Sequence, residues 1–154
     1  MEERDYRGEL NRFLVEVFND ILRAEEGCLS RQCPDLSVRE LHIIEEVCRA
    51  ADQRGDDRAS AIAAAQRVTA GTLTVAVNQL EAKGYLERVR DSGDKRSVHL
   101  RPTEKGREAE RRHAQFHREL VEAAVERLSA QELEALARGL GGISAFIRAN
   151  DPAS

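Results

Sequence analysis

Residues 68–102, "VTAGTLTVAVNQLEAKGYLERVRDSGDKRSVHLRP", decide the fold. They predict a helix that begins at Thr69 and closes at Gly84, because threonine caps helix N-termini and glycine adopts the left-handed conformation that ends helices. Two short alternating runs around Val89 and Val98 follow, joined by "DSGDKR", and they predict a β-hairpin with a glycine in its loop. The helix residues expected to face inward are Val75, Ala76 and Leu80.

Apolar spacing predicts two further helices before this stretch. The first covers about residues 6–25, and residues 26–36 are expected to form a connection. Ser37 and Glu40 then form a capping box, in which each side chain satisfies a free backbone N–H at the start of a helix that ends near Asp52. A short alanine-rich helix within residues 56–68 leads directly into the helix that begins at Thr69.

Two more helices are predicted after the hairpin. Thr103 caps a long helix, and Ser129 with Glu132 forms a second capping box that opens the last one. The glycines of "GLGG", residues 139–142, cost helix stability, so this helix is expected either to bend or to have another backbone packed closely against it.

Two short helices joined by a tight turn and followed by a hairpin describe a winged helix-turn-helix, and the second helix fits the DNA major groove. Its hydroxyls can meet phosphates or base edges, its small residues permit close approach, and its carboxamides can pair with adenine. The outward residues expected to contact DNA are Thr69, Ala70, Gly71, Thr72 and Thr74 near the amino end, with Asn78 and Gln79 further along.

Localised charge supports a nucleic-acid partner. The chain of 154 residues has a net charge of -4, yet residues 83–112 hold ten Lys and Arg against six Asp and Glu, so a basic segment is set in an acidic body. The N-terminal residues resemble no signal peptide, so the chain is expected to be cytoplasmic, with no membrane partner. No GxSxG, HExxH or phosphate-binding glycine loop occurs, so no enzyme is predicted.

Residues 62–106 resemble the DNA-binding core of the MarR family of bacterial transcriptional regulators. The wing of that family carries a D-x-R pattern, here Asp94-Lys95-Arg96, followed by "SVHLRPTEKG", in which Arg101-Pro102 departs from the usual leucine. The resemblance implies that Arg96 enters the minor groove, held by Asp94, and that Arg88 contacts the DNA backbone at the base of the wing. A narrow minor groove attracts arginine through its negative potential.

The resemblance extends over nearly the whole chain and implies one domain, residues 1–154. It is mainly α with a small β-hairpin: a winged helix-turn-helix core at 36–102, flanked by dimerisation helices at 1–35 and 103–154. The implied homodimer would act as a repressor and bind a pseudopalindromic double-stranded DNA operator, since two-fold symmetry presents two recognition helices.

The sequence is compatible with several kinds of effector. The closest resemblance is to the fatty-acid-synthesis repressors of the family, the FabT-like subgroup, whose implied corepressor is long-chain acyl-acyl carrier protein. An acyl chain needs an apolar tunnel, although core packing is the alternative role of any one of its residues. The candidate pocket residues are Phe13, Val17, Leu41, His42, Ile44, Phe116 and Leu120.

Neither DNA binding nor an acyl effector requires a cofactor, but zinc is an alternative effector. His113 and His117 lie at i and i+4 on one helix face, and with Glu25 and His42 they resemble the ligands of zinc-responsive members of the family. Ordinary hydrogen-bonding histidines explain the same pattern.

A thiol switch is a third possibility, in which Arg31 acidifies Cys33, whereas Cys48 is expected to be buried. A different class of function, a winged module that binds protein without DNA, also fits the acidic total charge.

Overall fold

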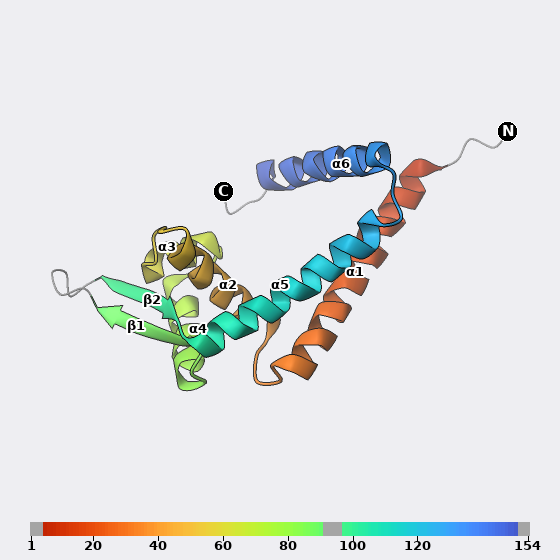
Figure 1. The fold of residues 1–154 in the computed structure, drawn as a ribbon. Helices are drawn as coiled ribbons and strands as arrows, with labels where there is room; N and C mark the ends of the chain where they lie inside the picture. Colours follow the sequence, from red (N-terminus) through yellow and green to blue (C-terminus); the bar gives the residue numbers. More distant parts are fainter. Residues whose placement is uncertain (1–4, 91–96, 151–154) are drawn as a thin grey trace. The chain divides into compact units, whose positions relative to one another are not determined.

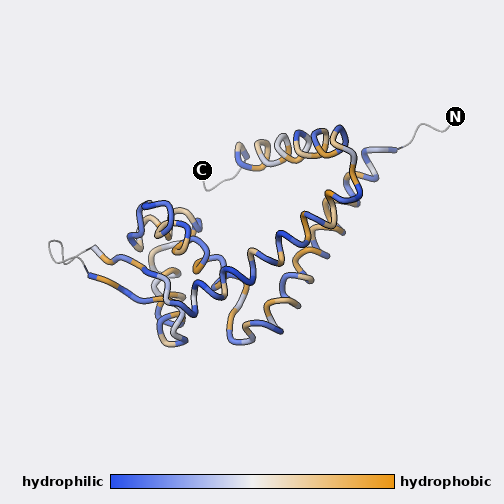
Figure 2. Tube along the Cα trace, in the orientation of Figure 1, coloured by the Kyte–Doolittle hydropathy of each residue, from blue (hydrophilic) through white to orange (hydrophobic). Residues whose placement is uncertain are grey.

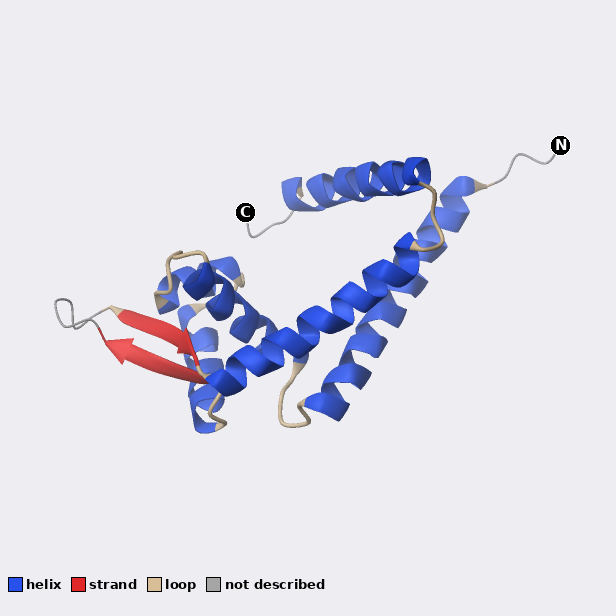
Figure 3. Ribbon diagram, viewed as in Figure 1, coloured by secondary structure: helices blue, strands red, loops and turns tan. Residues whose placement is uncertain are grey.

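The computed structural model describes residues 5–90 and 97–150, and within these ranges the chain is mainly helical with one antiparallel hairpin (Figures 1 and 3). The predicted fold class, a winged helix-turn-helix, is confirmed. The elements are α1 (Tyr6–Gln32), α2 (Val38–Asp52), α3 (Ala59–Ala65), α4 (Ala70–Ala82), β1 (Leu86–Arg90), β2 (Val98–Pro102), α5 (Glu104–Val125) and α6 (Ala130–Ala149).

The chain divides into two compact units, residues 1–113 and 114–154. The first unit contains the core, in which apolar side chains of α2, α3, α4 and the hairpin pack together. Its most completely buried residues are Leu41, Ile43, Ile44, Val47, Cys48, Ile62, Val77, Leu80 and Leu100. Burial of this much apolar surface fixes how the short helices and the hairpin sit against one another.

Predicted caps set the ends of the helices in this unit. Ser37 and Glu40 form the expected capping box, with the Ser37 N–H donating to Glu40 Oε2 at 2.9 Å. Thr69 Oγ1 accepts from the Thr72 N–H at 3.1 Å, and Gly84 takes a φ of 80° after the last turn of α4. Helix α2 therefore begins, and helix α4 begins and ends, where the sequence predicts.

The hairpin pairs β1 with β2 in a register that puts Arg88 opposite Leu100 and Arg90 opposite Val98. Because side chains alternate across a strand, these four residues share one face of the hairpin. The backbone N–H of Leu100 also donates to the carbonyl oxygen of Asp57 at 2.9 Å, which ties β2 to the segment that precedes α3. The base of the wing is thus anchored to the core.

The predicted connection at residues 26–36 is wrong in its first part, because α1 continues to Gln32. Glu25 and Leu29 are buried at 4% and 7% exposure, and Cys33 continues this buried face at 8%. Packing of this face outweighs the cost of Gly27 inside the helix, which is about 1 kcal/mol relative to alanine. The actual connection is the short segment between Gln32 and Val38.

The prediction that Val75 faces inward is also wrong, since Val75 is 59% exposed. The buried residues of α4 are Leu73, Val77 and Leu80, which follow one helical stripe. Val75 lies roughly 200° around the helix from Leu73, so it cannot share that stripe. Its side chain belongs to the outward face of α4.

The second unit holds the end of α5 and α6. Ser129 and Glu132 form the second predicted capping box, and α6 runs without interruption through Gly139, Gly141 and Gly142. None of the residues of α6 is buried, and a Cβ added at any of these glycines would meet nothing within 4 Å in the described chain. Within this chain, the glycines have no close neighbour to accommodate.

Apolar residues recur along α1 and α6, as the hydropathy colouring in Figure 2 shows, and many of their side chains remain exposed. In α1 they include Leu10, Phe13, Leu14 and Phe18, and in α6 they are Leu133, Leu136, Leu140, Phe146 and Ile147. Over residues 5–90 and 97–150, no helix combines the length and hydropathy needed to cross a membrane.

Among the described glycines of the first unit, Gly106 lies closest to another backbone segment. A Cβ built there would lie 2.3 Å from the carbonyl oxygen of Tyr85 and 3.7 Å from Cγ2 of Ile44. Thr103 completes this joint between α5 and the α4–β1 turn. Its Oγ1 accepts from the Gly106 N–H at 3.1 Å and donates to the Gly84 carbonyl oxygen at 2.7 Å. Only glycine allows the first turn of α5 to press against the end of the α4–β1 turn.

We therefore expect Gly106→Ala to lower the free energy of unfolding by about 2 kcal/mol or more, because the added methyl group forces two backbones apart. Gly27→Ala is the control, since its Cβ would meet only the flexible tip of Arg31 at 3.7 Å. That variant should gain up to about 1 kcal/mol from the better helix propensity of alanine. Urea unfolding followed by circular dichroism measures both, and equal stability of the two variants would contradict the close packing at Gly106.

Candidate nucleic-acid interface

The amino end of α4 presents small and hydroxylated residues to solvent. Thr69, Ala70, Gly71, Thr72 and Thr74 are all exposed, as the sequence predicts for this face. Thr69 Oγ1 and Thr72 Oγ1 lie 2.9 Å apart, and Thr74 Oγ1 donates to the Ala70 carbonyl oxygen at 2.8 Å. The exposed surface at the amino end of this helix therefore consists of small side chains and of hydroxyl groups that the helix itself holds in place.

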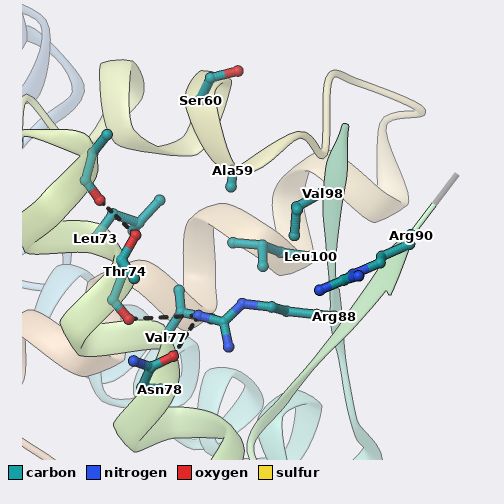
Figure 4. A pocket seen from close by; sticks show the side chains of 11 residues that line it. Ala59, Ser60, Leu73, Thr74, Val77, Asn78, Arg88, Arg90, Val98 and Leu100 are labelled. Carbon is teal, nitrogen blue, oxygen red and sulfur yellow. Dashed lines mark hydrogen bonds between the residues drawn. The ribbon is translucent and has the colours of Figure 1, made fainter. Parts of the chain in front are cut away.

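Arg88 joins this helix to the hairpin. Its guanidinium pairs with Glu81 through Nη1, and its Nη2 donates to Asn78 Oδ1 at 2.8 Å (Figure 4). Its backbone N–H donates to Glu81 Oε1 at 2.9 Å. Two of the predicted contact residues, Asn78 and Arg88, are thus brought together, and Glu81 connects to both the main chain and the side chain of Arg88.

A hollow of about 420 Å³ lies between α4 and the hairpin. Much of its lining is apolar, and Arg88 and Arg90 extend along it from β1 (Figure 4). The lining residues are Ala59, Ser60, Ala70, Leu73, Thr74, Val77, Asn78, Arg88, Arg90, Val98 and Leu100. Sequence reasoning did not single out Ser60, Glu81 or Arg90, although the two-residue alternation of β1 placed Arg90 beside Arg88.

Asp94, Lys95 and Arg96, the wing-tip residues, lie outside the described residues. Their expected entry into a minor groove stays a prediction from the resemblance.

Lys83 and Glu40 hold the far end of α4 against α2. Lys83 Nζ lies 2.7 Å from Glu40 Oε1, and the Glu40 side chain is only 9% exposed. Burial alone would raise the pKa of Glu40, but the hydrogen bonds from Lys83 and Ser37 outweigh it and lower the pKa below its usual value. One carboxylate therefore caps α2 and fixes α4.

A second cluster lies on the other side of the first unit, where α1, α2 and α5 meet. His113 Nε2 lies 2.7 Å from Glu25 Oε1, His113 Nδ1 pairs with Glu45, and His42 Nε2 lies 3.3 Å from the same Glu25 oxygen. Burial lowers the pKa of His113, but the hydrogen bonds and charges of Glu45 and Glu25 reverse this and raise it. Three of the four predicted zinc ligands thus converge.

His117, the fourth, follows His113 by four residues on α5, where its ring packs edge-on against Phe116 with centroids 5.4 Å apart. The donor types suit zinc, which prefers imidazole and carboxylate ligands. Glu45 adds a carboxylate on the second ring nitrogen of His113, a partner that commonly orients metal-bound histidines.

The residues predicted for an acyl pocket are not gathered around one cavity in the first unit. Leu41 and Ile44 are buried in the core, while Phe13 is 44% exposed and Val17 is partly buried. The cavity that Leu41 lines has a volume of about 10 Å³, roughly that of one water molecule. In the second unit Phe116 is partly buried and Leu120 is 38% exposed.

Burial opposes a thiol switch at the cysteines of the core. It raises the pKa of Cys33, although Arg112 acts in the opposite sense, so the prediction that Arg31 acidifies this thiol is wrong. Burial likewise raises the pKa of Cys48 to about 12, and the expected packing role of Cys48 is confirmed by its 2% exposure.

Comparisons with known proteins agree with this architecture. A family model described as "MarR family" matches residues 35–97. The structure of Streptococcus pneumoniae FabT in complex with DNA is similar with a TM-score of 0.84 and 36% identity, covering 94% of this chain and 98% of that one. The transcriptional regulator BldR from Sulfolobus solfataricus is similar with a TM-score of 0.62 and 26% identity, covering 96% of this chain and 100% of that one.

A curated relative, the uncharacterized HTH-type transcriptional regulator YwhA of Bacillus subtilis (strain 168), is 37% identical over 59 residues. That match spans 38% of this chain and 42% of the relative, so it covers less than half of either length.

The lowered pKa of Glu40 gives the first unit an acid-sensitive contact. A carboxyl group whose pKa falls on folding contributes stability above its unfolded pKa, near 4.3, and loses it as pH falls through the lower folded value. We expect Glu40→Gln to lower the free energy of unfolding by about 1 to 2 kcal/mol at pH 7, and the difference from the parent to shrink between about pH 5 and pH 3. Urea unfolding across this range measures it, with exposed Glu87→Gln as the control; a difference independent of pH would contradict the Glu40–Lys83 contact.

Proposed function

Since the chain belongs to the MarR family of transcriptional regulators, we propose that it binds double-stranded DNA as a homodimer and represses genes next to a pseudopalindromic operator in the cytoplasm. Regulators of this family are not enzymes, as the sequence predicts. The observation that carries the proposal is the exposed, hydroxyl-bearing face of α4 beside a hairpin whose adjoining face carries Arg88 and Arg90. FabT, at 36% identity, has been solved in complex with DNA.

In the proposed complex α4 enters the major groove. Thr69, Thr72 and Thr74 supply hydroxyl groups, and Ala70 and Gly71 let the helix approach closely. Arg96, supported by Asp94 and with Lys95 beside it, enters the adjacent minor groove.

The exposed apolar side chains support the homodimer. Leu10, Phe13, Leu14 and Phe18 of α1 and the leucines of α6 leave substantial apolar surface without cover in a single chain. The glycines of α6 have open space beside them, which suits close approach by a second copy. The terminal segments, 1–35 and 103–154, are therefore the proposed dimerisation helices, around the DNA-binding core at 36–102 within one domain, 1–154.

A protein-binding module without DNA affinity is the competing class. Selection from a random duplex library with the full chain should recover an inverted repeat with half-sites about 10 base pairs apart, because a two-fold dimer presents two recognition helices one helical turn apart. Arg96→Ala should weaken binding about tenfold, and binding should fall steeply with salt. Arg49→Ala, which removes an equal charge from α2, is the matched control. Failure to enrich any sequence, together with salt-independent binding, would favour the protein-binding class.

For the effector we propose long-chain acyl-acyl carrier protein acting as a corepressor. The support is the similarity to FabT over nearly the whole chain. The apolar residues Phe13, Val17, Phe116 and Leu120 remain at least partly exposed, as the wall of an acyl tunnel requires. Leu41, His42 and Ile44 complete the proposed set.

Zinc is a second candidate effector, favoured by the convergence of His42 and His113 on Glu25. Bound zinc would take ring nitrogens and a carboxylate oxygen from Glu25, His42, His113 and His117, and would tie helices α1, α2 and α5 together.

Operator affinity distinguishes the two effectors. We expect acyl-acyl carrier protein to tighten operator binding about tenfold, a typical coupling between two sites, while the unacylated carrier protein does not. Fluorescence anisotropy in the presence of a chelator, and then of added zinc, measures both effects. Tightening by zinc that His113→Gln abolishes, with no response to the acylated carrier protein, would replace the acyl proposal by the metal one.

A further inference from the structure

We propose that Glu81 is a positioning residue, which holds Arg88 against one sugar-phosphate backbone of a duplex seated in the hollow between α4 and the hairpin. This inference rests on the proposed function and on the backbone contact that the family resemblance implies for Arg88, and it adds the carboxylate that orients this contact.

The shape of a winged helix requires such a seat. When α4 occupies the major groove and the hairpin enters the neighbouring minor groove, the strand that separates these grooves must pass between the two elements. The hollow of about 420 Å³ lies between them, lined by α4, β1 and β2 and, from α3, by Ala59 and Ser60.

Charge in the hollow suits an anion. Its eleven lining residues include two arginines and no carboxylate, although the chain as a whole has a net charge of -4. Both arginines lie on the hairpin face that β1 shares with Val98 and Leu100. Arg101 and Glu87 lie opposite each other in the register, on the other face, so the two faces of one hairpin differ in charge. Charge complementarity therefore favours DNA backbone as the occupant.

Glu81 determines how Arg88 lies. Its two carboxylate oxygens bind separate parts of Arg88, because Oε1 accepts from the backbone N–H at 2.9 Å and Oε2 pairs with the guanidinium. This double attachment fixes the root and the tip of the side chain at once. The Arg88 side chain as a whole is left 28% exposed, on the surface that the backbone would approach.

Arg88 in turn orients Asn78. A guanidinium only donates hydrogen bonds, so the atom that faces it at 2.8 Å is the Asn78 carbonyl oxygen, Oδ1. The amide nitrogen of Asn78, an exposed residue, is left to donate outward. Bidentate pairing with adenine uses both the oxygen and the nitrogen of the amide. With the oxygen turned to Arg88, Asn78 and Arg88 present donors together, and a phosphate, which only accepts, matches them.

The first experiment compares Arg88→Ala with Arg101→Ala in the full chain. Two unrelated fluorescein-labelled duplexes of about 30 base pairs are titrated over a range of KCl concentrations, because a phosphate contact contributes equally on every sequence. Arg88→Ala should weaken binding about tenfold on both duplexes and reduce the slope of log affinity against log salt by about two per dimer, one phosphate for each protomer. Arg101→Ala, the same change on the opposite face, should remain within about threefold of the parent. Arg88→Lys should keep most of the slope and still lose affinity, since an ammonium lacks the fork that binds Glu81 and Asn78.

The second experiment tests Glu81 by the sign of its effect. Removing any carboxylate near DNA should tighten binding if the group only repels phosphate, and Glu87→Gln is expected to do so or to leave affinity unchanged. Glu81→Gln keeps an acceptor for the Arg88 N–H but releases the guanidinium, so it should weaken binding severalfold and shift the salt slope toward that of Arg88→Ala. The thermal midpoint of each variant, followed by circular dichroism, separates this effect from loss of the fold.

The results separate failure of the backbone seat from failure of the proposed DNA-binding function. If the parent chain binds neither duplex at low salt, the proposed DNA-binding function fails and the seat fails with it. If the parent binds, but Arg88→Ala matches Arg101→Ala or Glu81→Gln tightens binding as Glu87→Gln does, the seat is refuted while the function stands.

Discussion

The contact between Gly106 and the carbonyl oxygen of Tyr85 constrains the rest of the structure. It brings the first turn of α5 against the end of the α4–β1 turn and against Ile44 of α2, with no room for a side chain. Helix α5 leaves the DNA-binding core through this joint. Because packed interfaces shift between discrete arrangements and do not deform continuously, a movement of α5 at this point would displace α4 and the hairpin together.

A small number of polar contacts surround this joint and define the orientation of α4. Glu40 holds Lys83 at its end, and Glu81 holds Arg88 beside its third turn. On the other side of the core, Glu25 receives His113 of α5 and His42 of α2. The last cluster joins α5 to α1 and α2, while the first two contacts hold α4. The candidate metal ligands and the candidate DNA-binding helix are therefore both anchored in the first unit.

Most of the fold could be predicted from local chemistry. The capping boxes at Ser37 and Ser129, the Thr69 cap and the left-handed Gly84 each depend on residues close in sequence, and all are confirmed. The end of α1 could not be predicted, because the packing that carries the helix past Gly27 involves Leu29 against distant residues. Val75 was misplaced because a helix of alternating Val, Ala and Thr offers two possible apolar stripes. The role of Glu81 could not be predicted from the sequence, because its partner Arg88 lies across the turn that joins α4 to β1 and only the structure shows their contacts.

Helix α6 has a consequence for how this protein persists in solution. It spans 20 residues, none of them buried, and contains three glycines that each weaken a helix by about 1 kcal/mol relative to alanine. An isolated helix of this kind is marginal in water. In the proposed homodimer its order would be supplied by association, so ordering of the carboxyl-terminal segment and self-assembly would form a single equilibrium that depends on concentration. Dilution would melt this segment before it disturbs the winged core, and cellular abundance would set how much of the protein is competent to bind.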